Sequence, residues 1–245
     1  SIYAEEGTAA HELLELQLTN DLLPRQWQPI TPPFIGKNGA KVDADGIQHV
    51  KEAFDFVIDL MGTMKSRTLL VEQHVDPGIT WMGQSVSHGT ADILLIDHEA
   101  MTLYVLDYKH GKGHPVEIKD NVQLVLYALG ALNALVAFDF TSVVTGILQP
   151  RAHHVDGPFR LQKQTVDHII IQRHNLQKAA ERSMQPDAPC IAGEEQCRWC
   201  RAKATCASIA DLALARARAT FNPITQETTM DIEKNVANNL LKFAA

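Results

Sequence analysis

Apolar residues recur at helical or strand spacing along most of the chain. Val50, Phe54, Val57 and Met61 lie three or four positions apart, which predicts an amphipathic helix over 46–63. Similar patterns predict further helices over 3–18, 121–136, 166–184 and 207–220, and one in the tail from 228. Runs of aliphatic and β-branched residues predict strands over 69–75, 91–97, 102–108, 143–149 and 159–165. The short polar connection between the second and third of these strands suits a hairpin.

The order of these elements predicts a mixed α/β fold in which helices flank one central sheet. A chain of 245 residues can form one large domain or two small ones. We expect a core over 1–185, an irregular cysteine-bearing segment over 186–220 packed on that core, and a helical tail over 221–245. No apolar run approaches the length of a membrane span and no signal peptide opens the chain, so a membrane partner is not expected.

Charge narrows the classes of partner only slightly. The formal net charge is -7, whereas proteins that coat nucleic acid without specificity are usually basic. A nuclease is not excluded, because its own carboxylates need a metal before phosphate can approach. Arg198, Arg201 and Lys203 form a local basic group that could meet a phosphate backbone. Solvated helix charge is the alternative, and composition alone favours it.

The richest chemistry lies between Gly89 and Tyr127. Asp92 and Asp107 each lie in a strand-like apolar run, and Lys109 follows Asp107 at the spacing that places both side chains on one strand face. Two carboxylates and an amine at a sheet end are suited to hold Mg²⁺ or Mn²⁺ beside a hydrolytic water. The backbone carbonyl of Tyr108 lies between them and is a further candidate ligand. Half-exposed strand acids with a surface lysine are the alternative interpretation.

Neighbouring residues strengthen the catalytic interpretation. Gln123 and Tyr127 are spaced i, i+4, so they share one face of the next helix. His11 lies on the first helix, although a lone helical histidine is more often packed than ligating. Glu72 is a spare acid on a neighbouring strand that could complete a second metal site. His88 is one candidate to touch a substrate, and His110 is another.

Four stretches together resemble one enzyme family. They are G-T-A-A-H-E over 7–12, G-T-A-D over 89–92, D-Y-K over 107–109 and Q-L-V-L-Y over 123–127. The set resembles the RecB-type branch of the PD-(D/E)XK nucleases, and the sequence around these motifs is most similar to nucleases carried by phages and prophages. The likeness extends over nearly the whole chain and implies a restriction-endonuclease-like core.

The resemblance also implies a role for each motif residue. It makes His11, Asp92 and Asp107 the metal ligands and Lys109 the catalytic lysine. Gln123 and Tyr127 then help to position this lysine or the DNA. The implied protein is a cytoplasmic DNA exonuclease that acts on ends or single strands during phage recombination or replication, beside a helicase or recombinase.

All four cysteines lie between positions 190 and 206. The spacing Cys197-x2-Cys200-x5-Cys206 resembles the C-terminal triplet of iron–sulfur nucleases related to RecB, in which a fourth, upstream cysteine completes a [4Fe–4S] site. No cysteine precedes Cys190 here, so the fourth ligand is either Cys190 or a residue before Ser1. Zinc in place of the cluster, and four unligated thiols, are the alternatives.

Two other functional classes remain open at this point. One is a catalytically inactive protein that binds nucleic acid on a nuclease fold. The other is a regulatory module built around zinc or an iron–sulfur cluster. The acid, acid and lysine set favours the enzyme, because a binding module does not need a lysine two residues beyond a metal-binding acid.

Overall fold

The computed structural model describes residues 2–20, 25–198 and 200–220. The chain divides into two compact units, residues 1–185 and 186–245, which are described separately. Among the described residues, no helix combines the length and the apolar character that crossing a bilayer requires. The predicted helical tail from 228 lies outside the described residues.

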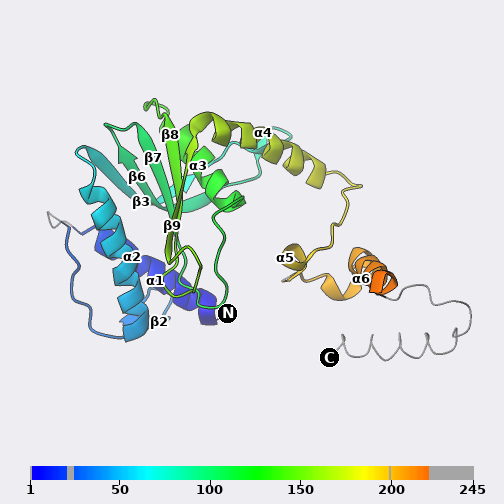
Figure 1. Cartoon of the computed structure of the whole chain (residues 1–245), viewed down its shortest axis with the longest axis horizontal. Coiled ribbons are helices and arrows are strands. Elements are labelled where there is room, and N and C mark those ends of the chain that lie inside the picture. The colour runs from blue at the N-terminus through cyan, green and yellow to red at the C-terminus, as the bar shows by residue number, and fades with distance from the viewer. Residues whose placement is uncertain (1, 21–24, 199, 221–245) are drawn as a thin grey trace, which may run out of the picture. The chain divides into compact units, whose positions relative to one another are not determined.

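A five-stranded mixed sheet forms the centre of the first unit (Figure 1). Its strands are β3 (Arg67–Val75), β6 (Gly89–Asp97), β7 (Thr102–Tyr108), β8 (Ser142–Leu148) and β9 (Phe159–Thr165), in the spatial order β3-β6-β7-β8-β9. Only β7 and β8 run parallel, and the other neighbouring pairs are antiparallel. The predicted α/β class, the central sheet and the hairpin between β6 and β7 are therefore confirmed.

Helices cover both faces of this sheet (Figure 1). On one face, α1 (Ile2–Leu18) and α2 (Ala44–Gly62) pack against Ile93, Leu95 and Leu106. On the other face, α3 (Val122–Ala134) packs against Leu94, Ile96 and Val105, and α4 (Val166–Ser183) adds Ile169 to the same cluster. Because both faces are buried, β6 shows a continuous apolar run instead of strict alternation.

Side-chain caps begin three of these helices. The Asp43 carboxylate accepts the Gly46 N–H at 2.8 Å, and the Asn121 carbonyl accepts the Leu124 N–H at 3.1 Å. Thr165 caps α4 in the same way by accepting the His168 N–H. Each cap satisfies a helical N–H that would otherwise have no partner, which explains why the predicted boundaries lie within about two residues of those observed.

Four two-residue strands among the described residues were not predicted from the sequence pattern. β1 (Phe34–Ile35) pairs with β2 (Lys41–Val42), and β4 (Thr80–Trp81) pairs with β5 (Gln84–Ser85). Such short strands have no detectable period.

In the described part of the second unit, short helical elements surround the cysteines. They are α5 (Glu194–Cys197), a 3₁₀ turn (Lys203–Thr205) and α6 (Ala207–Thr220). The bounds of α6 match the predicted helix over 207–220.

Candidate metal centre and its lysine

Strand register brings three acids to one end of the sheet. Ile93 pairs with Leu106, so Asp92 and Asp107 occupy the next facing positions on β6 and β7. Val71 pairs with Ile93 and Gln73 with Ala91, which sets Glu72 of β3 opposite Asp92.

The backbone at Glu72 departs from ordinary strand geometry. Its φ of 51° lies in the left-handed region, which is strained for a residue other than glycine. The position coincides with a local interruption in the pairing of β3 with β6. Strain of this kind persists where the surrounding structure enforces it, and it is common at functional sites.

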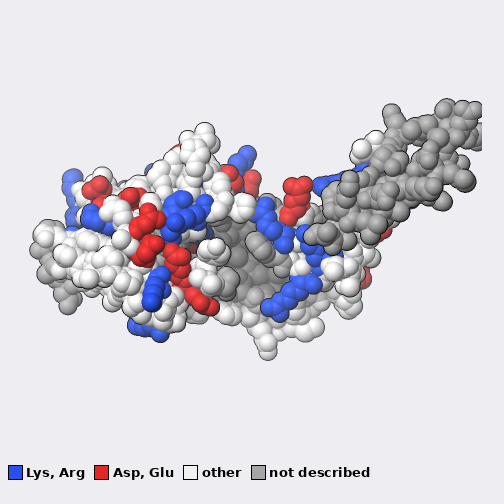
Figure 2. All heavy atoms as spheres, turned by 90° about the horizontal axis from the view of Figure 1, so that it is seen from below, with Lys and Arg blue, Asp and Glu red and all other residues white. Residues whose placement is uncertain are grey.

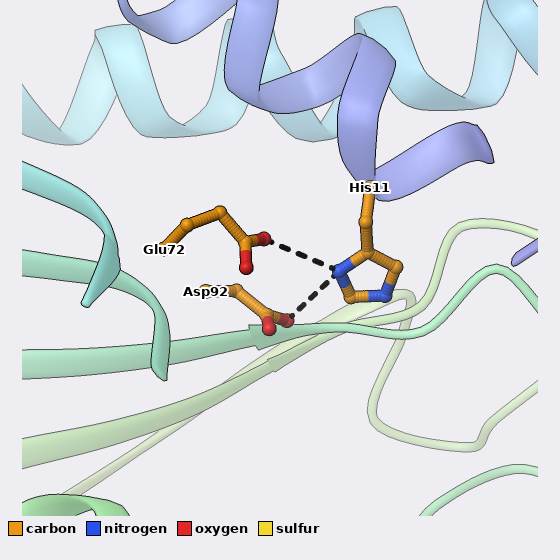
Figure 3. Close-up of side chains that lie close together, drawn as sticks. All are labelled: His11, Glu72 and Asp92. Atoms are coloured by element: carbon orange, nitrogen blue, oxygen red, sulfur yellow. Dashed lines mark ion pairs between the residues drawn. The ribbon is translucent and has the colours of Figure 1, made fainter. Parts of the chain in front are cut away.

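His11 reaches the same point from α1 (Figure 3). Its Nδ1 lies 3.5 Å from Oδ2 of Asp92 and 3.8 Å from Oε1 of Glu72. One ligand atom from each of the three residues lies within 4.8 Å of the others. An imidazole nitrogen with two carboxylates matches the donor chemistry of Mn²⁺, and the carboxylates also suit Mg²⁺.

The buried acids of this centre have raised pKa values, chiefly because burial disfavours their charged form. Burial raises the pKa of Asp92 to about 7; the charges of Asp107 and Glu72 add to this rise, while His11 and the hydrogen bond from the Tyr108 N–H oppose it. Burial likewise raises the pKa of Asp107, against the opposing charge of Lys109. For His11, burial acts to lower the pKa, but contact with Glu72 and the charge of Asp92 raise it overall. A bound cation would relieve this repulsion among the acids.

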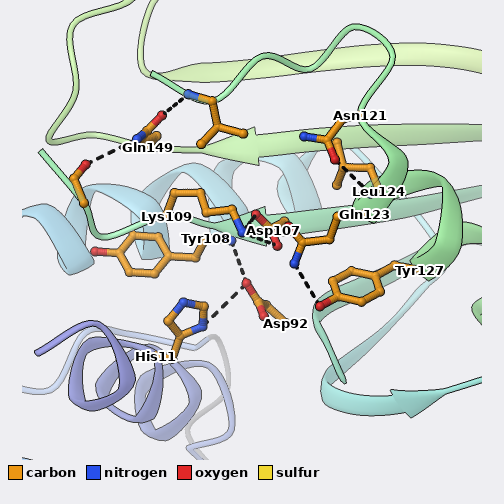
Figure 4. Close-up of polar contacts among 12 residues, drawn as sticks. His11, Asp92, Asp107, Tyr108, Lys109, Asn121, Gln123, Leu124, Tyr127 and Gln149 are labelled. Atoms are coloured by element: carbon orange, nitrogen blue, oxygen red, sulfur yellow. Dashed lines mark hydrogen bonds and ion pairs between the residues drawn. The ribbon is translucent and has the colours of Figure 1, made fainter. Parts of the chain in front are cut away.

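Asp107 pairs with Lys109 and does not join the group of His11, Glu72 and Asp92 (Figure 4). Lys109 Nζ donates to Oδ1 of Asp107 at 3.0 Å and lies 2.8 Å from Oδ2. Oδ2 is buried and accepts no hydrogen bond from the described residues, because the close ammonium lies outside hydrogen-bonding geometry. This oxygen therefore keeps lone pairs that no hydrogen bond from the described residues uses.

Gln123 and Tyr127, the two residues predicted to share a face of α3, extend this hydrogen-bond arrangement (Figure 4). Lys109 also donates to Oε1 of Gln123 at 2.9 Å, and Nε2 of Gln123 donates to the hydroxyl of Tyr127 at 2.9 Å. The contact made by Tyr108 is through its backbone N–H, which donates to Oδ2 of Asp92 at 2.7 Å. The Tyr108 carbonyl stays a predicted metal ligand. The structure thus brings every predicted motif residue to one sheet end.

A family match covers almost the whole chain. Residues 1–244 match the model of a family described as "Protein of unknown function (DUF2800)". The chain belongs to the DUF2800 family. One solved structure, titled "Crystal structure of SSO0001", aligns with 67% of this chain and 69% of its own at 10% sequence identity, with a TM-score of 0.34. That likeness is too distant to inform the function.

In this DUF2800 chain, a buried polar network connects α1, which carries His11, to the end of β7. The Tyr108 hydroxyl lies 2.8 Å from Nδ1 of His110, and Nε2 of His110 lies 3.1 Å from Oε1 of Glu6 on α1. Arg151 donates to the same Glu6 oxygen at 2.7 Å and also contacts His110. The rings of His11 and Tyr108 make an edge-to-face contact, with centroids 5.4 Å apart. These contacts orient α1 so that His11 faces Asp92.

Sequence patterns missed much of this network. The expectation that His110 is a candidate to touch a substrate is wrong, because the residue is 5% exposed. Burial, with the neighbouring Arg151, lowers the pKa of His110 to about 4, so it is neutral at pH 7. Arg151 and Glu6 stand far apart in the chain, and no local signal links them. The position of Glu72 beside Asp92 follows from the register of β3 against β6, which the sequence alone does not give.

In the second unit of the DUF2800 chain, the thiols are free. Cys190 and Cys200 are exposed, and Cys197 and Cys206 are partly buried. The sulfur of Cys197 accepts the Gly193 N–H at 3.4 Å, a contact typical of thiolate ligands. The donors suit a cluster or zinc, but among the described residues the sulfurs do not gather into a metal-binding group. The [4Fe–4S] or zinc site therefore stays a prediction.

Charged side chains at the surface of the described residues do not point to a further site. Arg198, Arg201 and Lys203 are all exposed in the second unit. On the face of the first unit drawn in Figure 2, acidic side chains gather beside scattered basic ones. Contact of the three basic residues with DNA stays a prediction.

Proposed function

We propose that this chain is a metal-dependent nuclease that hydrolyses phosphodiester bonds of DNA with Mg²⁺ or Mn²⁺. The observation that supports this most directly is the convergence of His11, Glu72 and Asp92 within reach of one ion, with Asp107 and Lys109 on the next strand. The choice of DNA, the preference for ends or single strands, and a role beside a helicase or recombinase in phage recombination or replication rest on the RecB-type resemblance.

Electrostatics support a metal centre over a purely structural ion pair. Asp92 is 8% exposed and Asp107 is 1% exposed, yet among the described residues the opposing positive charges at these acids come from His11 and Lys109 alone, with the Tyr108 N–H as a neutral donor. A structural cluster of this kind would lose free energy by keeping its acids ionised. A divalent cation held by His11, Glu72 and Asp92 would supply the missing positive charge.

Each residue then has a chemical task. When bound, such an ion polarises the scissile phosphate and lowers the pKa of a bound water. The Lys109 ammonium, held between Asp107 and Gln123, is positioned to stabilise negative charge that develops on the phosphate. Tyr127 binds the amide nitrogen of Gln123, which turns the carbonyl oxygen of that amide toward the lysine.

The test is a cleavage assay on end-labelled DNA, single- and double-stranded, linear and circular, with Mg²⁺, Mn²⁺ or EDTA. We expect cleavage that needs the metal and that falls by about 100-fold or more in Lys109→Ala and Asp107→Ala, the range for removing one group that stabilises transition-state charge. Lys65→Ala is the matched control, because Lys65 is exposed and pairs only with Glu99 among the contacts seen.

Two results would count against the proposal. Unchanged cleavage in both site variants, with a normal Lys65→Ala control, would remove the site assignment. DNA binding that is equal with and without EDTA, and no cleavage under any metal, would favour a catalytically inactive binding protein.

A further inference from the structure

A cavity of about 300 Å³ opens beside the N-terminal half of α3. Its walls come from the turn after β3, the segment before β6 and α3 itself, and they include Pro77, His88, Leu126 and Tyr127. The volume lies at the lower end of the range for small-molecule sites. None of the described residues that line it is Lys, Arg, Asp or Glu.

The segment that contributes Pro77 to the cavity wall is anchored on both sides of this residue. Asn133 of α3 donates to the Asp76 carbonyl at 2.8 Å. Gln177 of α4 makes two hydrogen bonds with the backbone of Thr80, at 2.8 and 2.9 Å. These contacts hold the segment between β3 and β6 against both helices, so the cavity is a built feature of the first unit.

Gln123 joins the cavity to the candidate metal centre. Its side chain lines the cavity, accepts a hydrogen bond from Lys109 and donates one to Tyr127 (Figure 4). Gly89, also in the wall, precedes Asp92 by three residues, or about 10 Å along a strand. The separation between Gly89 and Asp92 is similar to the distance between a phosphate and the base of an adjoining nucleotide.

Wall chemistry favours a flat, uncharged ring. Leu126 and Pro77 offer apolar surface, and the Tyr127 ring can stack on a planar partner. Gly89 makes room for this ring, because a Cβ at that position would lie 2.7 Å from Cε1 of Tyr127. The exposed imidazole of His88 and the amide of Gln123 provide polar edges. Among the described lining residues no Lys or Arg is present to pair with phosphate, whereas a nucleobase finds both apolar and polar surface.

We propose that this cavity receives one unpaired nucleobase of the strand whose phosphate lies at Lys109. The inference rests on the proposed nuclease function and extends it to a substrate class, namely single-stranded DNA or a frayed end. A base inside a duplex cannot enter a recess unless it is first unpaired and unstacked. Base recognition here is insensitive to sequence, because every base presents a face for stacking.

The binding test compares two fluorescein-labelled single-stranded oligonucleotides of equal length, one of thymidine nucleotides and one with an abasic backbone. Both are titrated with the Lys109→Ala protein in Mg²⁺ and followed by fluorescence anisotropy, so that cleavage does not interfere. We expect the thymidine strand to bind about 10- to 100-fold more tightly, the range for stacking of one base. Adding Leu126→Trp fills the cavity and should remove most of this preference.

Three further variants keep the result interpretable. Ser87→Trp fills the same cavity from its loop, in case Leu126→Trp disturbs α3, and circular dichroism checks the fold of each protein. Ile171→Trp is the control, because this residue is 64% exposed on α4 and away from the cavity wall. Tyr127→Phe keeps the ring but loses the bond to Gln123, so it should retain the base preference while cleavage slows.

The outcomes separate the cavity from the chemistry. Equal binding of the thymidine and abasic strands, or an unchanged preference in both folded tryptophan variants, would overturn the base site even if the wild type cuts DNA. A base preference that both tryptophan variants remove, in a protein that cuts nothing under any metal, would support the base site and reject the nuclease.

Discussion

Replacing Asp92 by Asn should change how stability depends on pH. Folding raises the pKa of this carboxyl from 3.8 to about 7, chiefly through burial. Between these values the folded state holds a proton that the unfolded chain releases, so stability is highest at low pH and falls as pH rises. At 1.36 kcal/mol for each pH unit, the whole interval corresponds to about 4 kcal/mol of unfolding free energy.

Asparagine at position 92 should remove the fall in stability with rising pH and keep the hydrogen bond with Tyr108. Its side-chain oxygen can still accept the Tyr108 N–H that now lies 2.7 Å from Asp92, and it has no proton to release. In the absence of metal, the variant should therefore gain on the wild type as pH increases. By the same linkage relation, the gain between pH 5 and pH 8 is about 2–3 kcal/mol.

The assay is urea unfolding in EDTA, followed by circular dichroism at pH 5, 6, 7 and 8. Asp59→Asn serves as the control, because Asp59 is exposed on α2 and its replacement should leave the pH profile unchanged. If the wild-type and Asp92→Asn curves stay parallel across this range, Asp92 is not a buried acid that burial keeps protonated, and the charge argument for the metal centre fails.

Three more predictions test the site and the fold. Mn²⁺ at 100 times its dissociation constant at pH 8 should raise the unfolding free energy by about 2.7 kcal/mol. The same Mn²⁺ concentration should give a smaller increase at pH 6, because protons compete for the ligands and weaken binding; a full effect in His11→Ala would exclude that ligand. Gly130→Ala should lower the unfolding free energy by about 1–3 kcal/mol in urea unfolding, because the added Cβ would lie 2.7 Å from Cβ of Val75. Gly113→Ala is the control, because a Cβ there meets open space. Equal urea midpoints for the two variants would contradict the packing at Gly130. Asp43→Ala should cost about 1 kcal/mol through its lost cap, and unchanged thermal unfolding would show that the cap is dispensable.

The longer elements were predictable because their causes are local. The apolar run Ile93–Ile96 and the helical spacing of Val50, Phe54 and Val57 are properties of short windows, and tertiary packing reinforces them. The pairs β1–β2 and β4–β5 were not predictable. Each strand has two residues, so turn geometry and neighbouring helices determine it, and periodicity has nothing to act on.

The candidate site divides in the same way. Alternation along β7 placed Asp107 beside Lys109, and helical spacing placed Gln123 beside Tyr127, as the hydrogen bonds show. His11 entered through resemblance to a family, since one helical histidine has no local signature. Sequence alone therefore determined the types of side chain present and their local neighbours.

Only the tertiary structure decided which groups share a centre. The register of β3 on β6 set Glu72 against Asp92, and the left-handed backbone at Glu72 accompanies that contact. Asp107 accepts a hydrogen bond from Lys109, whereas Asp92 lies beside the imidazole of His11 on α1. These outcomes depend on pairings between segments far apart in the chain, whose geometry is set by the packing of the whole sheet and its helices, and no short window contains that information.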